Sequence, residues 1–287
     1  MFKKLSYLLF GLIKLFDKFI KLIFKKNFLL HFKDYVEKDL YCEIKILDNK
    51  IKFFTPNQLV DWRVKTFFFK EPETIEWIDN FKNNENPIFW DIGANIGLFS
   101  IYNAIKNPNS TTFSFEPSTS NLRTLSRNIS INKLEKSIKI LPFPLSNKEN
   151  IHLEMKEENF IEGGALNTFG ENYDFEGKNF EGENRYQLFG TTIDFLIKQQ
   201  ILKVPDYIKI DVDGIEHLIL EGASNCLKEK KIKSISVEIN ENFKDQHDKI
   251  LKIMELHNFK LLSKKNNNKF FDKKSKFSKI FNYVFVR

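Results

Sequence analysis

A chain of 287 residues, 42% hydrophobic and 29% charged, is long enough to bury at least one α/β domain, and its composition is typical of a folded globular protein. Its two cysteines, Cys42 and Cys226, lie far apart and have no metal-ligand spacing, which excludes a disulfide framework or a zinc site and leads us to expect a cytoplasmic location. The formal charge of +7 does not indicate a nucleic-acid partner, because residues 1–30 and 264–280 each carry a net charge of +6 and the rest of the chain is acidic.

Residues 1–30 are predicted to form an amphipathic basic helix. Lys14, Lys18, Lys21 and Lys25 follow one stripe of a helical wheel, while Leu, Ile and Phe cover most of the remaining surface. Lysines interrupt the apolar stretch, which is evidence against a membrane-spanning helix and against a secretory signal. We expect residues 2–26 to lie in an anionic membrane interface, making the protein peripheral on the inner face of the cytoplasmic membrane. Packing against the rest of the chain or in a dimer is the alternative.

Residues 31–86 are expected to form an N-terminal cap. The segments YCEIKIL (41–47) and KIKFF (50–54) flank a turn signal at Asp48-Asn49, and RVKTFFF (63–69) is interpreted as a further short strand. The segment KEPET (70–74) is predicted to open a helix that continues to about Phe81, because Pro72 suits a first helical turn.

Residues 87–287 alternate between strand and helix patterns, which predicts a doubly wound, mostly parallel sheet. The predicted strands are IFWDI (88–92), TTFSFEP (111–117), SIKILPF (137–143), YIKIDV (207–212) and SISVEI (234–239), and helices are predicted to begin near Ile96, Ser118, Thr192, Ile215 and Asp245. Two more strands are predicted at 259–263 and 283–287. Residues 151–190 lack periodicity and are interpreted as a long insertion of the substrate-loop kind. The basic segment 264–280 is expected on the active-site side, facing an anionic acceptor.

The first of these strands ends in a glycine-containing loop with an acid ahead of it. Asp91, Gly93, Asn95 and Gly97 do not make the G-x-G-x-x-G pattern of a dinucleotide loop, since Asn95 stands where the second glycine would be. An acid at Asp91 suits the ammonium of a methionine moiety better than a pyrophosphate. Glu116 ends the next strand, where a carboxylate can accept both ribose hydroxyls. The loop therefore favours S-adenosylmethionine over NAD.

A cluster of acids follows the fourth predicted strand. Asp211, Asp213 and Glu216 fall within six residues, and Glu238 ends the fifth strand. Such acids can bind a cation, with Asp211, Asp213 and Glu238 offering oxygen ligands to Mg²⁺, or one of them can be a base toward a hydroxyl. The alternative is a helix N-terminus stabilised by acids. His217 is a candidate general base, with a structural role as its alternative.

Five motifs in order, DIGANIGLFS, SFEP, TTIDFL, IKIDVDGIEHLILEGA and VEI, resemble those of FkbM-like methyltransferases over about residues 67–240. The resemblance implies a class I methyltransferase fold, whose last strand runs antiparallel beside the fifth, and methyl transfer from S-adenosylmethionine to a sugar hydroxyl of a glycan or glycolipid. The implied cofactor contacts are Asp91, Gly93, Asn95, Gly97, Glu116, Pro117, Leu145, Ser146 and Asp211. The implied catalytic residues are Asp211, Asp213, Glu216 and His217.

Two positions depart from the family pattern, since Asp213 stands where relatives usually carry Glu and Pro144 stands where Ala is more usual. Two other functions remain as alternatives. One is an NAD(P)-dependent oxidoreductase or epimerase acting on nucleotide sugars, which the missing third glycine disfavours. The other is a noncatalytic membrane-docked scaffold, which the acids Asp91, Glu116 and Asp211 disfavour.

Overall fold

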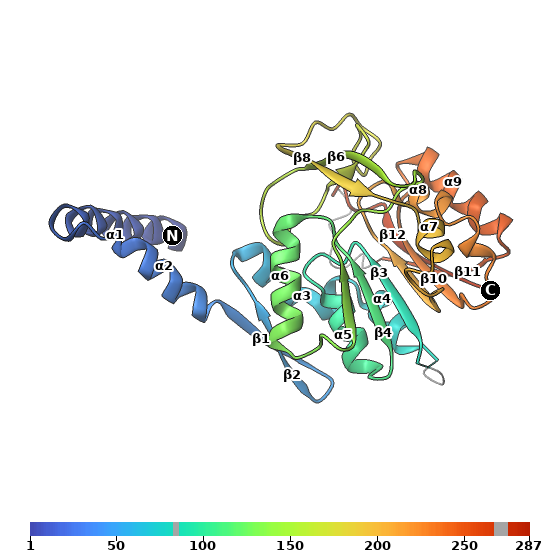
Figure 1. Cartoon of the computed structure of the whole chain (residues 1–287), viewed down its shortest axis with the longest axis horizontal. Helices are drawn as coiled ribbons and strands as arrows, with labels where there is room; N and C mark the ends of the chain where they lie inside the picture. Colours follow the sequence, from blue (N-terminus) through green and yellow to red (C-terminus); the bar gives the residue numbers. More distant parts are fainter. Residues whose placement is uncertain (83–85, 267–274) are drawn as a thin grey trace.

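The computed structural model describes residues 1–82, 86–266 and 275–287. Its centre is a seven-stranded sheet with the order β11-β12-β10-β9-β3-β4-β5 (Figure 1). The parallel strands are β3 (Ile88–Ile92), β4 (Thr111–Phe115), β5 (Ile138–Leu141), β9 (Tyr207–Ile210) and β10 (Ser234–Asn240). The last strand, β12 (Ile280–Val286), runs antiparallel between β10 and β11 (Lys260–Lys265). The expected doubly wound sheet with an antiparallel last strand is confirmed.

Helices cover both faces of this sheet, so its central strands are apolar on both sides. Neighbouring residues of β3 pack into two different cores, Phe89 into one and Trp90 into the other. The core around Phe89 includes α4 (Pro72–Asp79), α5 (Leu98–Lys106) and α6 (Thr119–Ile131). The core around Trp90 includes α7 (Ile193–Lys198), α8 (Glu216–Glu221) and α9 (Lys244–Leu256).

The N-terminal cap differs from its prediction in one element. Strands β1 (Tyr41–Ile46) and β2 (Asn49–Phe54) form the expected hairpin, but residues 63–69 belong to the helix α3 (Gln58–Lys70) and not to a strand. The side chain of Asn57 accepts a hydrogen bond from the Val60 amide at 2.9 Å and caps this helix. Val60, Val64 and Phe67 then recur at helical spacing and are buried against the sheet. A cap and a buried helical face outweigh the strand preference of the β-branched and aromatic run.

The long insertion also contains strands that its sequence did not predict. Strands β6 (Ile151–Glu157), β7 (Thr168–Phe169) and β8 (Asn184–Gly190) form a three-stranded antiparallel sheet, and β6 and β8 lie at the top of Figure 1. In β8 more and less exposed residues alternate, as they do in a strand with one covered face. The segments between these strands carry the residues that reach the functional site.

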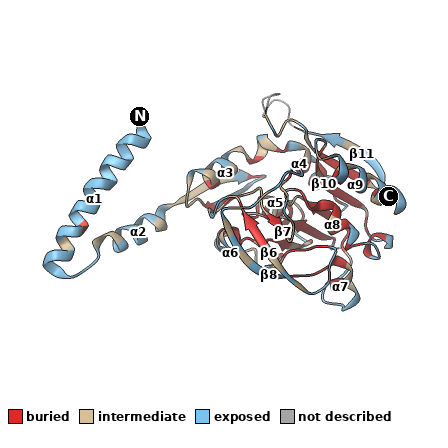
Figure 2. Cartoon of the chain, turned by 90° about the horizontal axis from the view of Figure 1, so that it is seen from above, coloured by how far each residue is buried: buried red, intermediate tan, exposed pale blue. Residues whose placement is uncertain are grey.

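Two N-terminal helices, α1 (Phe2–Phe24) and α2 (Phe28–Asp39), project from the body of the molecule (Figure 1). Lys25, in the left-handed conformation, ends α1, and the Asp17 carboxylate accepts a hydrogen bond from the Leu29 amide at 2.8 Å. At its far end α2 is held to α6 by Glu37, which pairs with Arg123 and Arg127. Nearly all of α1 is solvent-exposed (Figure 2). None of the helices in the described ranges has the length and apolar character needed to cross a bilayer.

Candidate functional site

Two adjoining cavities open at the carboxyl ends of the central strands, where β3 lies between β9 and β4 and the direction of the crossovers reverses. The smaller cavity encloses about 580 Å³ and the larger about 1690 Å³, in both cases including the open space at the mouth. The residues that line both are Gly93, Asn95, Gly164, Asp211 and Asp213. These five residues form the shared wall between the two cavities. A group transferred from a ligand in one cavity to a ligand in the other would therefore pass beside them.

The two glycines of the loop after β3 are required by contacts within the protein. Gly93 has a φ of +85°, and a Cβ there would lie 1.8 Å from the Asp211 carbonyl oxygen, so only glycine lets the ends of β3 and β9 approach. Gly97 has a φ of +87°, and a Cβ there would lie 2.5 Å from Leu125 Cδ1 on α6. Gly93 lines both cavities, whereas Gly97 is absent from both linings and serves helix packing.

Glu116, directly after β4, is the buried carboxylate of the smaller cavity. Its Oε2 accepts a hydrogen bond from the Asn95 amide at 2.6 Å, and its Oε1 accepts one from the Ser118 amide at 2.8 Å. Burial raises the pKa of Glu116 to about 7, although both backbone amides oppose that shift. Each oxygen keeps a lone pair for a ligand hydroxyl.

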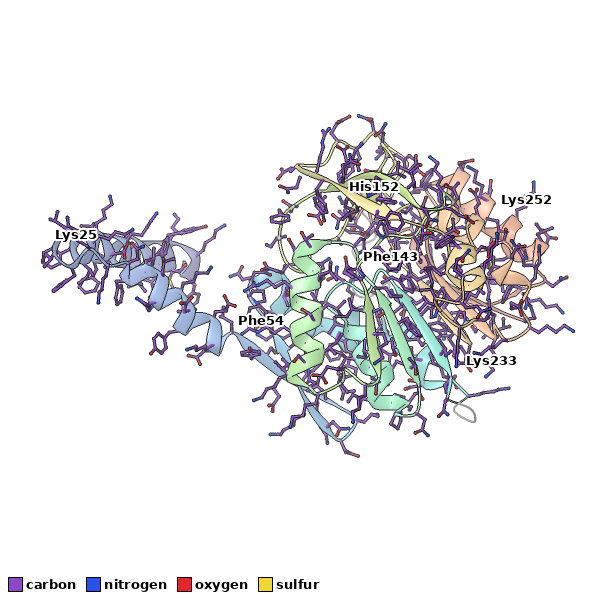
Figure 3. All side chains as sticks on the ribbon, in the orientation of Figure 1. Lys25, Phe54, Phe143, His152, Lys233 and Lys252 are labelled. Carbon is purple, nitrogen blue, oxygen red and sulfur yellow. The ribbon has the colours of Figure 1, made fainter. Side chains whose placement is uncertain are left out.

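The rest of the smaller cavity is largely apolar. Its walls include Pro117, Phe143, Leu145 and Met155. Figure 3 shows Phe143 inside the body, between the central strands and the strand β6 that carries His152. Flat apolar walls beside one buried carboxylate fit a nucleoside, with its base between the walls and its ribose hydroxyls on Glu116. The residues present therefore fit the adenosyl group of S-adenosylmethionine.

The insertion covers the shared wall with residues 162–166. The Asn95 side chain donates to the Gly164 carbonyl at 2.7 Å. Asn121, on α6, donates to the same carbonyl at 3.1 Å and accepts from the Gly163 amide at 2.8 Å. Arg63, on α3, donates to the Gly163 carbonyl at 2.7 Å. Three separate elements thus hold this segment over the cofactor loop.

The predicted acid cluster is assembled in the larger cavity by Asp211, Asp213 and Glu238, whose carboxylate oxygens lie within 4.8 Å of one another. Lys209, almost completely buried, donates to Asp211 Oδ2 at 2.6 Å. Burial favours a higher pKa for Asp211, but the Lys209 ammonium outweighs it and holds that pKa below its ordinary value. Asp211 is therefore ionised at neutral pH.

The two other acids of this cluster titrate at higher pH. Burial raises the pKa of Asp213 to about 6, and the Asp211 charge adds to the shift, while the Leu166 amide donates to Asp213 Oδ2 at 2.7 Å. Burial and the charge of Asp211 raise the pKa of Glu238 well above its ordinary value. As a Mg²⁺ site the trio fits poorly, because the Lys209 ammonium occupies one Asp211 oxygen and repels a cation.

Five of the predicted site residues do not line either cavity: Gly97, Asp91, Ser146, Glu216 and His217. Asp91 is 0% exposed, and its Oδ2 accepts a hydrogen bond from Ser100 Oγ at 2.5 Å, so its carboxylate faces α5 and cannot meet the ammonium of a ligand in these cavities. Burial raises the pKa of Asp91, although Lys209 opposes the shift. Ser146 is buried, and its backbone amide donates to the Thr191 carbonyl.

Glu216 and His217 are buried in the first turn of α8. Glu216 accepts hydrogen bonds from the Val212 and Gly214 amides and from Gln246 Nε2, and burial raises its pKa to about 7. His217 is 2% exposed, with its ring 6.2 Å from that of Phe243, and burial lowers its pKa. Glu216 thus holds the turn that presents Asp211 and Asp213.

Sequence analysis did not identify several residues that line the candidate site. Lys209 could have been noticed, because a charged residue inside a buried parallel strand requires a partner. The larger cavity is also lined by Arg63 and Lys70 of α3, by Glu71 between α3 and α4, and by Glu73 of α4, all of which precede the cofactor loop in the chain. The segment KEPET was predicted only to open a helix, and its sequence alone does not predict that it faces the acid cluster.

The chain matches a methyltransferase family model, one methyltransferase sequence and several solved structures. The family model described as "Methyltransferase FkbM domain" matches residues 91–261. "Methyltransferase sdnD" from Sordaria araneosa is 28% identical over 177 residues, which cover 54% of this chain and 68% of that protein. A methyltransferase FkbM structure from Methylobacillus flagellatus KT has 15% identity and a TM-score of 0.49, covering 79% of this chain and 52% of its own. The chain thus spans about half the length of that structure. TrmK of M. capricolum, solved with S-adenosyl-homocysteine, has 12% identity and a TM-score of 0.41, covering 74% of this chain and 66% of its own.

Proposed function

Because the chain belongs to the FkbM methyltransferase domain family, we propose that it transfers a methyl group from S-adenosylmethionine to a sugar hydroxyl of a glycan or glycolipid. The observation that carries this proposal is the pair of cavities with one shared wall. The smaller cavity suits an adenosyl group, and the larger one has room for an acceptor. Asp211 and Asp213 lie at their junction, where a methyl group would pass.

S-adenosylmethionine, when bound, supplies an electrophilic methyl group on a sulfonium. The protein binds and aligns the reactants: Glu116 accepts the ribose hydroxyls, and the Gly93–Asn95 loop faces the methionine end. Asp213, with its pKa of about 6, is largely deprotonated at neutral pH and accepts the proton of the attacking hydroxyl. Lys209 holds Asp211 ionised beside it, and Asp91, Glu216 and His217 act as positioning residues.

Calorimetry on the full chain with S-adenosylhomocysteine, NAD and NADP tests this assignment. We expect S-adenosylhomocysteine to bind and the two dinucleotides not to bind, because the loop lacks the third glycine of a pyrophosphate site. Binding of NAD or NADP without S-adenosylhomocysteine would favour the oxidoreductase alternative. Binding of none of the three would favour the noncatalytic scaffold.

No step of this proposal uses a metal. Transfer activity should therefore persist in EDTA, because the charge of Asp211 is already compensated by Lys209. Loss of activity in EDTA with recovery on addition of Mg²⁺ would instead assign Asp211, Asp213 and Glu238 to a metal site.

Docking of α1 on an anionic membrane surface is the second part of the proposal. Large apolar side chains cover α1 and are exposed, including Leu8, Leu15 and Leu22 at 64%, 69% and 73%. The seven lysines of residues 1–30 supply the complementary charge for anionic headgroups. Figure 3 shows Lys25 at the far end of the two projecting helices, away from the catalytic body. Docking would bring a lipid-linked glycan to the cavity at high local concentration.

Vesicle co-sedimentation tests docking on the full chain. Lys14→Glu with Lys18→Glu should weaken binding to vesicles containing anionic lipid by about tenfold or more, because each lysine contributes about 1 kcal/mol near a charged surface. Lys230→Glu with Lys252→Glu, on the exposed surface of the body, is the matched control and should bind as the unchanged chain does. If the wild-type chain dimerises through α1 and does not bind anionic vesicles, α1 is a protein-contact helix and not a membrane-docking helix.

A further inference from the structure

The larger cavity is lined by more acids than bases. Among the described residues, its lining includes the acids Glu71, Glu73, Glu158, Asp211, Asp213 and Glu238 and the bases Arg63, Lys70 and Lys209. Each base is already engaged within the protein. Lys70 pairs with Glu71 at 2.5 Å, Lys209 with Asp211 at 2.6 Å, and Arg63 donates to the Gly163 carbonyl. Burial raises the pKa values of Glu73 and Glu238, which lowers their charge, but the acids of the lining still outnumber its bases.

The lining also carries acceptor atoms that lack a donor within the described part of the chain. Glu71 is 8% exposed, and while its Oε1 accepts from Lys70, its Oε2 has no hydrogen-bond partner. Asn95 Oδ1 and Asn266 Oδ1 are buried and equally unpaired. Their amide nitrogens donate to backbone carbonyls, which fixes the oxygen as the free atom of each side chain. Buried acceptors without donors are costly, so a ligand that donates to them is favoured.

Two of the four described lysines of the basic segment 264–280 pair with acids, and a third, Lys276, lies over the Phe277 ring. Lys264 pairs with Glu241, and Lys265 pairs with Glu76 at 2.7 Å. Both lysines lie at a separate surface depression beside the larger cavity. Residues 267–274, on which part of the expectation of an anionic acceptor rests, lie outside the described ranges.

We propose that the larger cavity selects an acceptor that is rich in hydrogen-bond donors and carries no negative charge, a neutral or amino sugar, and that Glu71 and Glu73 determine this selection. The inference rests on the proposed function and narrows its acceptor class. Hydroxyl or ammonium groups would satisfy Glu71 Oε2 and the two asparagine oxygens. A carboxylate or phosphate would instead meet like charge at close range in a partly desolvated cavity. Trp62 and Phe277 add aromatic faces of the kind that line small-molecule sites.

Saturation-transfer NMR titrations test this acceptor selectivity on the full chain saturated with S-adenosylhomocysteine. The probes are the methyl glycosides of glucose, glucosamine and glucuronic acid, which share a ring and differ in charge. We expect the first two to bind at least about tenfold more tightly than the uronide at low ionic strength, since tenfold corresponds to about 1.4 kcal/mol. Equal or tighter binding of the uronide, or binding of none of the three, overturns the inference. A chain that fails to bind S-adenosylhomocysteine defeats the proposed function instead, so the two failures are distinct.

Two conservative variants assign the effect to residues. Glu71→Gln and Glu73→Gln should each weaken binding of the glucosamine glycoside by about tenfold and reduce discrimination against the uronide. Glu76→Gln, on the same helix but outside the larger cavity, is the matched control and should leave both affinities unchanged. An unchanged affinity for S-adenosylhomocysteine shows that each variant is folded. If both cavity variants discriminate as the unchanged chain does, Glu71 and Glu73 are not selectivity residues.

Discussion

At the scale of single residues, the site is built from carboxylates whose protonation is set by their surroundings. Asp211 stays ionised because a buried lysine lies beside it, whereas burial raises the pKa of Asp213 to about 6 and that of Glu116 to about 7. Carboxylates of one site can thus take different roles. In the proposed function Glu116 binds the ribose hydroxyls and Asp213 accepts the proton.

Glu116→Ala should weaken S-adenosylmethionine binding by about 1–3 kcal/mol, because it removes the buried acceptor of the ribose hydroxyls. Calorimetry with S-adenosylhomocysteine measures the loss. Glu135→Ala, at an exposed position after α6, is the control and should bind normally. Unchanged affinity of the Glu116 variant would show that the smaller cavity does not hold the adenosyl group.

Asp213→Asn should reduce kcat by about 10²–10⁴-fold while leaving S-adenosylhomocysteine affinity nearly unchanged, because it removes a base and keeps the shape of the site. For the unchanged enzyme, kcat should rise as pH increases through about 6 and then level off, since the base acts only when deprotonated. The variant should lack this dependence. A profile that rises through the same pH in the variant would assign the titration to another group.

At the scale of elements, residues 162–166 of the insertion couple the cofactor loop to α3 and α6. Asn121 makes two of the contacts, to the Gly163 amide and the Gly164 carbonyl. Arg123, also on α6, pairs with Glu162 and with Glu37 of α2. The segment over the cofactor loop and the base of the projecting helices therefore share one helix.

Asn121→Ala should loosen this segment, because both of its hydrogen bonds are lost and the buried Gly163 amide is left unpaired, while the Gly164 carbonyl keeps only the bond from Asn95. Hydrogen exchange of peptides covering residues 158–167 should become faster, and S-adenosylhomocysteine should bind more weakly. Ser126→Ala, at an exposed position of the same helix, is the control. Equal exchange rates in both variants would mean that Asn121 does not order the segment.

At the scale of the whole molecule, several buried acids link stability to pH. Burial raises the pKa of Glu116 and of Glu216 to about 7 and that of Asp213 to about 6. The folded state therefore binds these protons more tightly than the unfolded state does. The contribution of these groups to folding stability is complete below their ordinary pKa values of 4.5 and 3.8. It is lost as pH rises through their folded-state pKa values toward 7.

The ligand-free chain should consequently have a higher Tm at pH 5.5 than at pH 8. Glu216→Gln should reduce the loss between these conditions by about 2 kcal/mol, since one pKa unit corresponds to about 1.4 kcal/mol and part of the contribution is already lost at pH 5.5. The Gln246 amide can turn to accept from the new side chain, because its own oxygen has no partner among the described residues. Urea unfolding at both pH values measures the effect. A variant with the same pH dependence as the unchanged chain would contradict it.

The sequence by itself determined the elements of the central sheet and the position of the cofactor loop. Strand and helix periods are local properties, and the ends of parallel strands meet at one edge, so Glu116, Asp211 and Glu238 could be brought together from their places in the chain. Tertiary structure decided the rest. Residues 63–69 became a helix because Asn57 caps it and one face is buried. Asp91 and Glu216 turned inward because buried serine, glutamine and backbone donors were available there. Glu71 and Glu73, far from Glu238 in sequence, line the larger cavity together with it because packing of α4 beside the sheet brings them to one surface.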